Sequence, residues 1–119
     1  MAFSELKESS WRELLLWLSG FRKRFRVIGT SMVPLLRPGD EVLVNPRAYR
    51  QTVPQVGDIV VSRHPYRVDV RLVKRITTLL EDGRCLLEGD NPSDSTDSRS
   101  FGAVAPQRIL GRVTSRLPR

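Results

Sequence analysis

The stretch DIVVSRHPYRVDVRLVKRI, residues 58–76, decides the fold class of this chain. It contains two runs rich in valine and isoleucine, DIVVS at 58–62 and VDVRLVKRI at 68–76, on either side of the loop-like RHPYR. Residues with branched Cβ atoms and an alternation of apolar and polar positions are typical of β-strands. The stretch therefore predicts two short strands separated by a loop.

Further runs of the same kind lie on both sides of this stretch: FRVIG at 25–29, EVLVN at 41–45, CLLEG at 85–89 and ILGRVTSRL at 109–117. Clusters of Gly, Pro, Asp and Asn that favour turns separate the runs, at 37–40, 56–58, 81–83 and 89–98. Six short strands with little helix predict a mostly β fold, a small antiparallel sheet that is folded on itself or closed into a barrel.

Residues 10–20 have the period of a helix instead. Ser10 and Glu13 have the spacing of a capping box, and Gly20 is placed to end a helix. The apolar residues of one helical face are Trp11, Leu14, Leu15 and Leu18. We predict a short amphipathic helix whose apolar face packs on the domain. The alternative is that this face and the basic residues at 22–26 contact a membrane surface or a partner.

The length and composition fit one packed domain. The chain has 119 residues, of which 39% are hydrophobic and 28% charged, so it can bury a core. We divide it into a helical and basic segment at 1–26 and a β domain at 27–119. Its 20 Lys and Arg against 13 Asp and Glu give a net charge of +7, which favours anionic partners or surfaces.

The apolar stretch at 11–21 does not have the features of a membrane span or a signal peptide. It is about half as long as the ~20 residues that a membrane-spanning helix needs, and its basic cluster follows the apolar run instead of preceding it. We therefore expect a cytoplasmic protein. Peripheral membrane contact, where it occurs, would be made by the N-terminal helix.

The single cysteine and the single histidine exclude several kinds of site. Cys85 cannot form an internal disulfide, and one Cys with one His does not make a zinc site. We expect Cys85 to be buried, His64 to be a loop residue that is solvated or bonded locally, and the protein to need no metal and no cofactor. A hydrolase on this chain needs a base other than histidine.

Lys74 lies in an apolar row of the run at 68–76. Strand alternation places it on one face with Val68, Val70, Leu72 and Ile76. Burial disfavours a charged ammonium group and lowers the lysine pKa, and a neutral lysine can act as a general base. The alternative is a lysine that extends its ammonium group to water.

Ser31 is the candidate nucleophile. It stands in GTSMVPLLRPGD at 29–40, just after a predicted strand, where Gly29 permits a sharp turn and Pro34 restricts the chain. A serine hydroxyl needs a base to react, and backbone N–H groups at such a turn can stabilise an oxyanion. Taken alone, such a segment is more often an ordinary turn, so the assignment depends on its combination with a base.

Four segments resemble, in order, the boxes of the signal peptidase I family of serine-lysine peptidases. They are GTSMVPLLRPGDEVLV at 29–44, GDIVV at 57–61, RLVKRI at 71–76 and GDNPSDSTDSRSFGAV at 89–104. The resemblance covers about residues 27–113, and it implies the LexA-like β core of that family, with 27–119 as the catalytic domain. It implies Ser31 as nucleophile and Lys74 as the base that activates first the hydroxyl and then the deacylating water.

The resemblance also implies residues that support the site. Ser95 corresponds to a serine that orients the lysine, and Asp97 and Arg99 correspond to a supporting ion pair. Met32 follows the nucleophile as the family pattern expects, and we expect it to pack beneath the site. Gly29 stands where some members supply a hydroxyl to the oxyanion hole, so backbone donors must suffice here.

The chain departs from typical secretory members of that family. Leu35 replaces a usual threonine, and the large inserted subdomain and the membrane anchor have no counterpart in the sequence. The short, anchorless form most resembles the nickel-type superoxide dismutase maturation proteases. That resemblance implies a precursor protein as substrate, whose N-terminal leader is removed to expose the residues that bind nickel.

Three other interpretations remain open. A compact secretory-type signal peptidase would use the same serine and lysine, with residues 11–21 holding it on a membrane. A self-cleaving repressor would need a helical DNA-binding domain, and the first 26 residues have no helix-turn-helix pattern. A basic β-barrel that binds nucleic acid is favoured by the charge but needs aromatic side chains on a sheet face, and only 7% of the residues are aromatic. We therefore expect no nucleic-acid partner.

Overall fold

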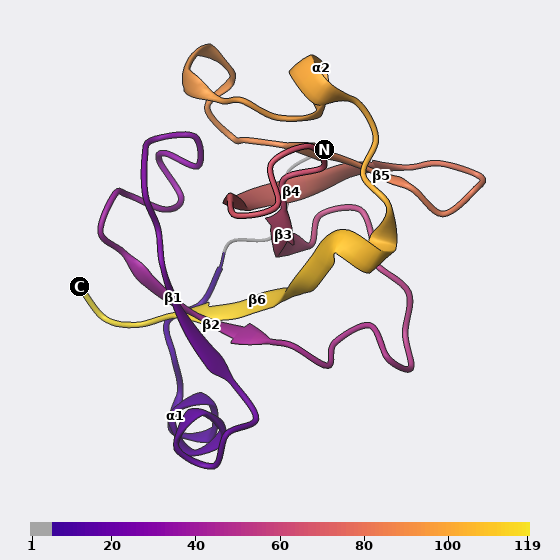
Figure 1. Cartoon of the computed structure of the whole chain (residues 1–119). Helices are drawn as coiled ribbons and strands as arrows, with labels where there is room; N and C mark the ends of the chain where they lie inside the picture. The colour runs from indigo at the N-terminus through magenta and orange to yellow at the C-terminus, as the bar shows by residue number, and fades with distance from the viewer. Residues whose placement is uncertain (1–5) are drawn as a thin grey trace.

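The computed structural model describes residues 6–119, in which six strands form one antiparallel sheet (Figure 1). The strands are β1 (Lys23–Arg26), β2 (Glu41–Asn45), β3 (Ile59–Arg63), β4 (Arg71–Leu79), β5 (Cys85–Glu88) and β6 (Ile109–Arg116). The described helices are α1 (Trp11–Leu18), α2 (Ser98–Phe101) and the 3₁₀ turns η1 (Pro92–Asp94) and η2 (Pro106–Arg108). The strand order is β1-β2-β6-β3-β4-β5, which confirms the mostly β, antiparallel prediction as an open sheet with β1 and β5 at its edges.

The first strand lies earlier in the chain than expected. A strand predicted at 25–29 is observed at Lys23–Arg26, because Gly29 has a φ of +82° and the chain turns as it approaches this residue. β1 pairs with β2, so residues 23–26 form part of the sheet. The division of the chain at residue 26 stays a prediction.

The strand that carries Lys74 starts later than expected. A strand predicted at 68–76 is observed from Arg71, since the preceding residues form a loop that the N–H of His64 closes by donating to the carbonyl oxygen of Val70 (2.9 Å). Val68 and Val70 therefore lie outside the apolar row of Lys74, and their predicted place in that row is wrong.

Two apolar clusters cover the sheet. The larger contains Val27, Met32, Leu36, Val42, Val44, Ile59, Val61, Val73 and Val113. The smaller contains Val60, Ile76, Cys85, Leu87 and Val104. Lys74 is paired with Val60 across β3 and β4, and cross-strand partners share one face of a sheet, so this lysine belongs to the side of the smaller cluster.

α1 has the ends that the sequence predicts. The Ser10 hydroxyl accepts a hydrogen bond from the N–H of Glu13 (3.3 Å) at the N-terminus. After the helix, the N–H of Gly20 donates to Trp17 (3.0 Å), and the N–H of Phe21 donates to Leu16 (2.8 Å). These two bonds form a Schellman motif around a glycine with a φ of +84°. No helix within residues 6–119 is long and apolar enough to cross a bilayer.

The apolar face of α1 does not pack on the domain, so that prediction is wrong. Trp11, Leu15 and Leu18 are 82%, 58% and 79% exposed. The helix is attached through a polar residue instead, because the Glu13 carboxylate accepts hydrogen bonds from Arg22 Nε (3.1 Å), Ser115 Oγ (3.0 Å) and the Thr114 hydroxyl. The side of α1 that faces the sheet is therefore anchored by charge, and the apolar side faces outward.

Candidate active site

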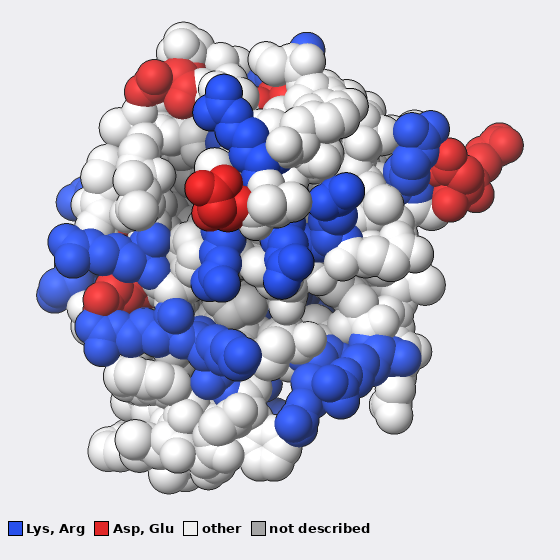
Figure 2. All heavy atoms as spheres, viewed as in Figure 1, with Lys and Arg blue, Asp and Glu red and all other residues white. Residues whose placement is uncertain are grey.

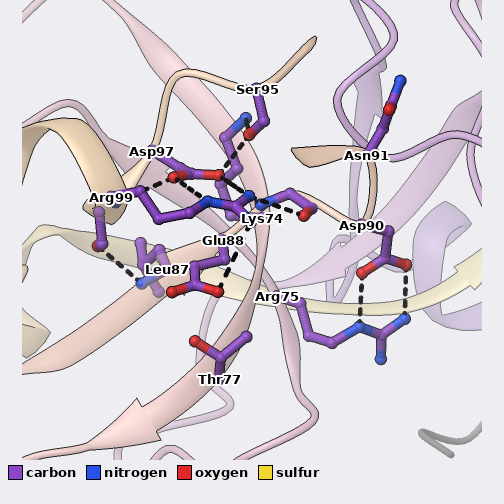
Figure 3. Close-up of polar contacts among 12 residues, drawn as sticks. Lys74, Arg75, Thr77, Leu87, Glu88, Asp90, Asn91, Ser95, Asp97 and Arg99 are labelled. Carbon is purple, nitrogen blue, oxygen red and sulfur yellow. Dashed lines mark hydrogen bonds and ion pairs between the residues drawn. The ribbon is translucent and has the colours of Figure 1, made fainter. Parts of the chain in front are cut away.

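Lys74 lies in the middle of β4 and is only 4% exposed. Its Nζ donates a hydrogen bond to Ser95 Oγ at 3.1 Å (Figure 3). Burial lowers the pKa of Lys74, the nearby Asp97 carboxylate opposes this shift, and the Arg99 guanidinium adds to it. The amine is thus held where its neutral form, the form that can accept a proton, is favoured more than in water.

Asp97 is the centre of the polar network beside Lys74. Its fully buried carboxylate accepts hydrogen bonds from Ser95 Oγ (2.5 Å), the N–H of Gly89 (2.8 Å) and Arg99 Nε (3.0 Å) (Figure 3). Burial alone would raise the pKa of Asp97, but the hydrogen bonds from Arg99, Ser95 and Gly89 outweigh burial and lower it. The ionised form of Asp97 is therefore strongly favoured in this network.

The direction of the hydrogen bonds follows from the charge on Asp97. An ionised carboxylate can only accept, so the Ser95 hydroxyl donates its proton to Asp97. The Ser95 oxygen then accepts from Lys74, which uses one amine proton of the lysine and fixes the position of Nζ. Ser95 and Asp97 thus orient Lys74 without taking a proton from it.

The loop that carries Ser31 is held against the segment after β5. The Ser31 carbonyl oxygen accepts a hydrogen bond from the N–H of Asn91 (2.8 Å), and Asn91 Nδ2 donates to the Thr30 carbonyl oxygen (3.1 Å). The Thr30 hydroxyl donates to the Asp94 carboxylate. Within residues 6–119 the hydroxyl of Ser31 has no hydrogen-bond partner, so it is not committed to a structural contact.

Gly89 is the point at which the two halves of the site meet. A Cβ atom at this residue would lie 2.4 Å from Ser95 Oγ and 2.6 Å from the Ser31 carbonyl oxygen. Both distances are under 3.0 Å, which real Cβ atoms essentially never show, so a side chain here would force its neighbours to shift. The absence of a side chain at Gly89 therefore lets the Ser31 loop approach Ser95, and through it the amine of Lys74.

The remaining predicted site residues lie around the Ser31 loop. Met32 is 1% exposed and belongs to the larger apolar cluster, which anchors the loop from below. Gly29 has a φ of +82° and open space around it. A glycine is favoured at this position because of its backbone conformation, and not because a side chain would lack room. The structure thus brings Lys74, Ser95, Asp97 and Arg99 together by direct contacts, and it places Ser31, Met32 and Gly29 on the adjoining loop.

Comparison with known proteins identifies the family of the chain. The family model described as signal peptidase, peptidase S26, matches residues 14–80 and 77–117. The chain belongs to this family. The match begins within α1, ahead of the segment around residue 27 where the sequence resemblance starts.

Individual relatives come from mitochondria and bacteria. Identity is 32% over 108 residues with mitochondrial inner membrane protease subunit 1 of Xenopus tropicalis, covering 75% of this chain and 65% of the relative. It is 35% over 101 residues with subunit 2 of Mus musculus, covering 67% and 58%. It is 26% over 129 residues with the probable signal peptidase I-1 of Synechocystis sp., covering 72% and 66%. The chain spans less than two thirds of the length of these S26 relatives.

Several residues that the sequence reasoning missed lie next to residues of the candidate site. Arg75 follows Lys74 on β4 and points to the other face, where Nε and Nη2 each donate to the Asp90 carboxylate at 2.9 Å (Figure 3). Gly89, Asp90 and Asn91 stand together directly after β5. In the sequence they form the triplet GDN directly after a strand. This triplet predicts a turn, but it does not show that the backbone of the Ser31 loop packs against it.

His64 and Cys85 lie apart from this network. His64 Nδ1 accepts hydrogen bonds from the N–H groups of Tyr66 (3.0 Å) and Arg67 (3.2 Å), so the imidazole is bonded locally, as predicted. Cys85 is fully buried, as predicted, and burial raises the pKa of its thiol. In the described part of the chain, no three His, Cys, Asp or Glu side chains lie close enough to hold a metal ion.

Proposed function

We propose that this chain is a serine endopeptidase that removes an N-terminal leader from a precursor protein, with Ser31 as nucleophile and Lys74 as general base. One observation carries the proposal. A buried lysine with a lowered pKa is oriented by Ser95, next to a loop whose serine hydroxyl is uncommitted. A structural lysine has no need of such an environment, whereas a general base does.

The reaction is acyl transfer through an ester. Neutral Lys74 takes the Ser31 proton as Oγ attacks the scissile carbonyl carbon, and the resulting ammonium group gives this proton to the departing amine. Lys74, neutral again, then takes a proton from the water that cleaves the ester. Backbone N–H groups of the Ser31 loop stabilise the oxyanion, because Gly29 has no hydroxyl to offer.

The substrate that we propose is a nickel-type superoxide dismutase precursor, cleaved ahead of its nickel-binding residues. The support is the resemblance of this chain to the maturation proteases of that enzyme. We place the reaction in the cytoplasm, with α1 as the part of the protein that contacts a membrane. Nickel belongs to the substrate, and the cleavage itself needs no metal.

A compact signal peptidase is the second candidate. A relative whose name is probable signal peptidase I-1 and the exposed apolar face of α1 favour it. Such an enzyme would use the same residues on secretory leader peptides at a membrane.

The test is incubation of the purified protein with the dismutase precursor and, separately, with a secretory leader peptide, with the new N-terminus read by mass spectrometry. Ser31→Ala should abolish cleavage. Ser100→Ala is the matched control, because Ser100 is an exposed serine of α2 outside the network, and it should cleave like the wild type. Cleavage of the secretory peptide alone would select the second candidate, and equal cleavage by Ser31→Ala would refute the mechanism.

A further inference from the structure

A basic pocket of about 260 Å³ opens where residues of β1, β2, β3, β4 and β6 meet. Its floor is apolar and consists of buried or half-buried side chains, Phe25, Val44, Val61 and Leu110. Its rim carries the exposed cations Lys23, Arg24, Arg63 and Arg71. None of the described residues that line the pocket is acidic. Figure 2 shows Lys and Arg side chains gathered on the face of the molecule in view.

Most of the charge at this rim is not neutralised within the chain. Arg24 is paired with Glu41, whereas the other three cations form no ion pair among residues 6–119. Arg63 and Arg71 are also direct partners across β3 and β4. Like charges directly opposite each other destabilise a sheet, and an anion bound between these two arginines would remove the repulsion.

The pocket and the Ser31 loop rest on the same apolar core. All four floor residues belong to the larger apolar cluster or pack against it. Met32, the residue after Ser31, is a member of that cluster too. The same packing therefore fixes the position of the pocket relative to the candidate nucleophile.

The chain itself limits the distance between the pocket and the candidate active site. Arg71 precedes Lys74 by three residues on β4, which corresponds to about 10 Å at the rise of a strand. Phe25 precedes Ser31 by six residues, so their Cα atoms lie at most about 22 Å apart. An extended substrate whose scissile bond lies at Ser31 would span such distances with about three to six residues.

We propose that this pocket binds an acidic side chain of the precursor substrate, about three to six residues from the scissile bond, and that Arg63 and Arg71 select it. The inference rests on the proposed peptidase function. A carboxylate between two guanidinium groups accepts hydrogen bonds from both, and Lys23 places a third cation at the same rim. The apolar floor fits the aliphatic stem of a glutamate.

Charge and chemistry favour an acidic peptide over other occupants. A small inorganic anion would leave the apolar floor without a function. A single-stranded nucleic acid would need several aromatic rings on which its bases stack, and Phe25 is the one aromatic residue among the described residues that line the pocket. A second copy of the chain would bring the same cations against each other.

Binding is measured first, separately from cleavage. The probe is a short fluorescein-labelled peptide in which glutamate alternates with alanine, and its matched control has glutamine in place of glutamate. The Ser31→Ala protein is used, so that the probe is not cut. We expect fluorescence anisotropy to show binding of the glutamate peptide about tenfold tighter than that of the glutamine peptide, because each partly exposed ion pair contributes about a factor of three.

Paired variants assign this preference to the pocket. Arg63→Gln with Arg71→Gln should remove most of the tenfold preference. Arg12→Gln with Arg50→Gln removes the same charge at two exposed arginines outside the pocket, and it should have a much smaller effect. Thermal unfolding should show the pocket variant to be at least as stable as the wild type, because the like-charge pair is gone. A loss of binding is then not a loss of fold.

Cleavage shows whether the pocket serves the peptidase. The dismutase precursor and the secretory leader peptide are each given glutamate, or glutamine as control, three to six residues from the cleaved bond, on the leader side or on the mature side. We expect glutamate on one side to lower KM about tenfold with little change in kcat, because a contact remote from the reacting atoms strengthens substrate and transition-state binding alike. Arg63→Gln with Arg71→Gln should abolish this difference.

Several results would overturn the proposal. They are equal binding of the glutamate and glutamine peptides, an equal loss of binding in the Arg12 and Arg50 control, and cleavage that glutamate improves on neither side. Tighter binding of a single-stranded oligonucleotide, lost in the pocket variant alone, would assign the pocket to nucleic acid instead. Binding of the glutamate peptide by a wild-type protein that cleaves neither substrate would refute the proposed function and leave the pocket as a site for acidic peptides.

Discussion

At the α2 end of the sheet the cation of Lys74 is buried and bonded to Ser95, whereas at the α1 end cations and apolar side chains are exposed together. Within residues 6–119 no buried side-chain nitrogen or oxygen lacks a hydrogen-bond partner. Every polar group of the buried network therefore has a hydrogen-bond partner, while burial lowers the pKa of Lys74. The α1 end has the opposite arrangement, with the half-buried carboxylate of Glu13 as its anchor and Trp11, Leu15 and Leu18 exposed.

The difference shows that amphipathic patterns do not by themselves decide burial. In β4 the side chain of Lys74 lies in an apolar row and is buried, because Ser95 accepts its hydrogen bond and the Asp97 carboxylate is nearby. In α1 an apolar row stays outside, because Glu13 finds partners on β6 that only its side of the helix can reach. At both ends a carboxylate decides which side chains the fold covers.

Removal of the buried cation should have the largest effect. Lys74→Met and Ser31→Ala should each reduce kcat/KM by about 10³-fold or more, and the double variant should be little worse than either, because the two residues act as one unit. Lys74→Met should still fold, since an apolar side chain of similar size replaces a buried charge. Peptide cleavage with circular dichroism as the folding control measures this, and an active Lys74→Met would contradict the assigned base.

A side chain at Gly89, where the backbone packs against Ser95 and the Ser31 loop, should have the next largest effect. Gly89→Ala should reduce kcat by about 10²-fold, because the added Cβ would push the Ser31 loop away, and moving the nucleophile by about 1 Å has an effect of this size. Gly111→Ala is the matched control, since a Cβ there would lie 2.6 Å from the Asn45 carbonyl oxygen, in another part of the sheet. It should lower stability without a specific loss of kcat. Equal losses of kcat in both would indicate a general folding defect.

Both the activity and the stability should depend on pH through Lys74, at the α2 end of the sheet. Because Lys74 must be neutral to act, kcat/KM should rise about tenfold per pH unit below the pKa of Lys74 and then level off. The lowered pKa means that the unfolded chain binds more protons than the folded one between that pKa and the ordinary value of 10.5.

The free energy of unfolding of the wild type, relative to Lys74→Met, should therefore rise with pH across this window and be lowest below it. Urea unfolding at several pH values measures the difference. A difference that does not change with pH would show that Lys74 has its ordinary pKa in the folded protein.

Loss of the anchor of α1 should have a moderate effect. Glu13→Ala should lower the free energy of unfolding by about 1–3 kcal/mol, because the hydroxyls of Thr114 and Ser115 and the guanidinium of Arg22 lose a charged acceptor. Glu81→Ala, at an exposed position in the turn between β4 and β5, is the control and should change little. A Glu13→Ala protein as stable as the wild type would mean that other contacts hold the helix.

Changes to the outward face of α1 should have the smallest effect on stability. Leu18→Ser should change the free energy of unfolding by no more than about 0.5 kcal/mol, because Leu18 is exposed. The comparison is Leu87→Ala, in the smaller buried cluster, which should cost about 2–5 kcal/mol. A large loss for Leu18→Ser would show that this face is covered in the folded protein.

Much of the sheet and of the candidate site could be predicted from the sequence. The strand at 41–45 is observed at its predicted bounds, because a valine-rich run between clear turns defines a strand locally. Gly89 and the Arg75 pair with Asp90 could not be found in this way, since the contacts join residues whose proximity depends on the pairing of β4 with β5. The loop before Arg71 was missed for a related reason, because Val68 and Val70 extend the alternation of the strand without joining its ladder.

By itself the sequence determined the local periods, the turns and the order of the four family segments, and with them Ser31 and Lys74 as the candidate pair. Only the tertiary structure decided that Lys74 is buried beside Ser95 and that the apolar face of α1 is exposed. The physical reason is that a period shows which side chains share a face, whereas burial depends on what the rest of the chain places against that face. For α1 those partners, Thr114 and Ser115, lie about a hundred residues away in sequence.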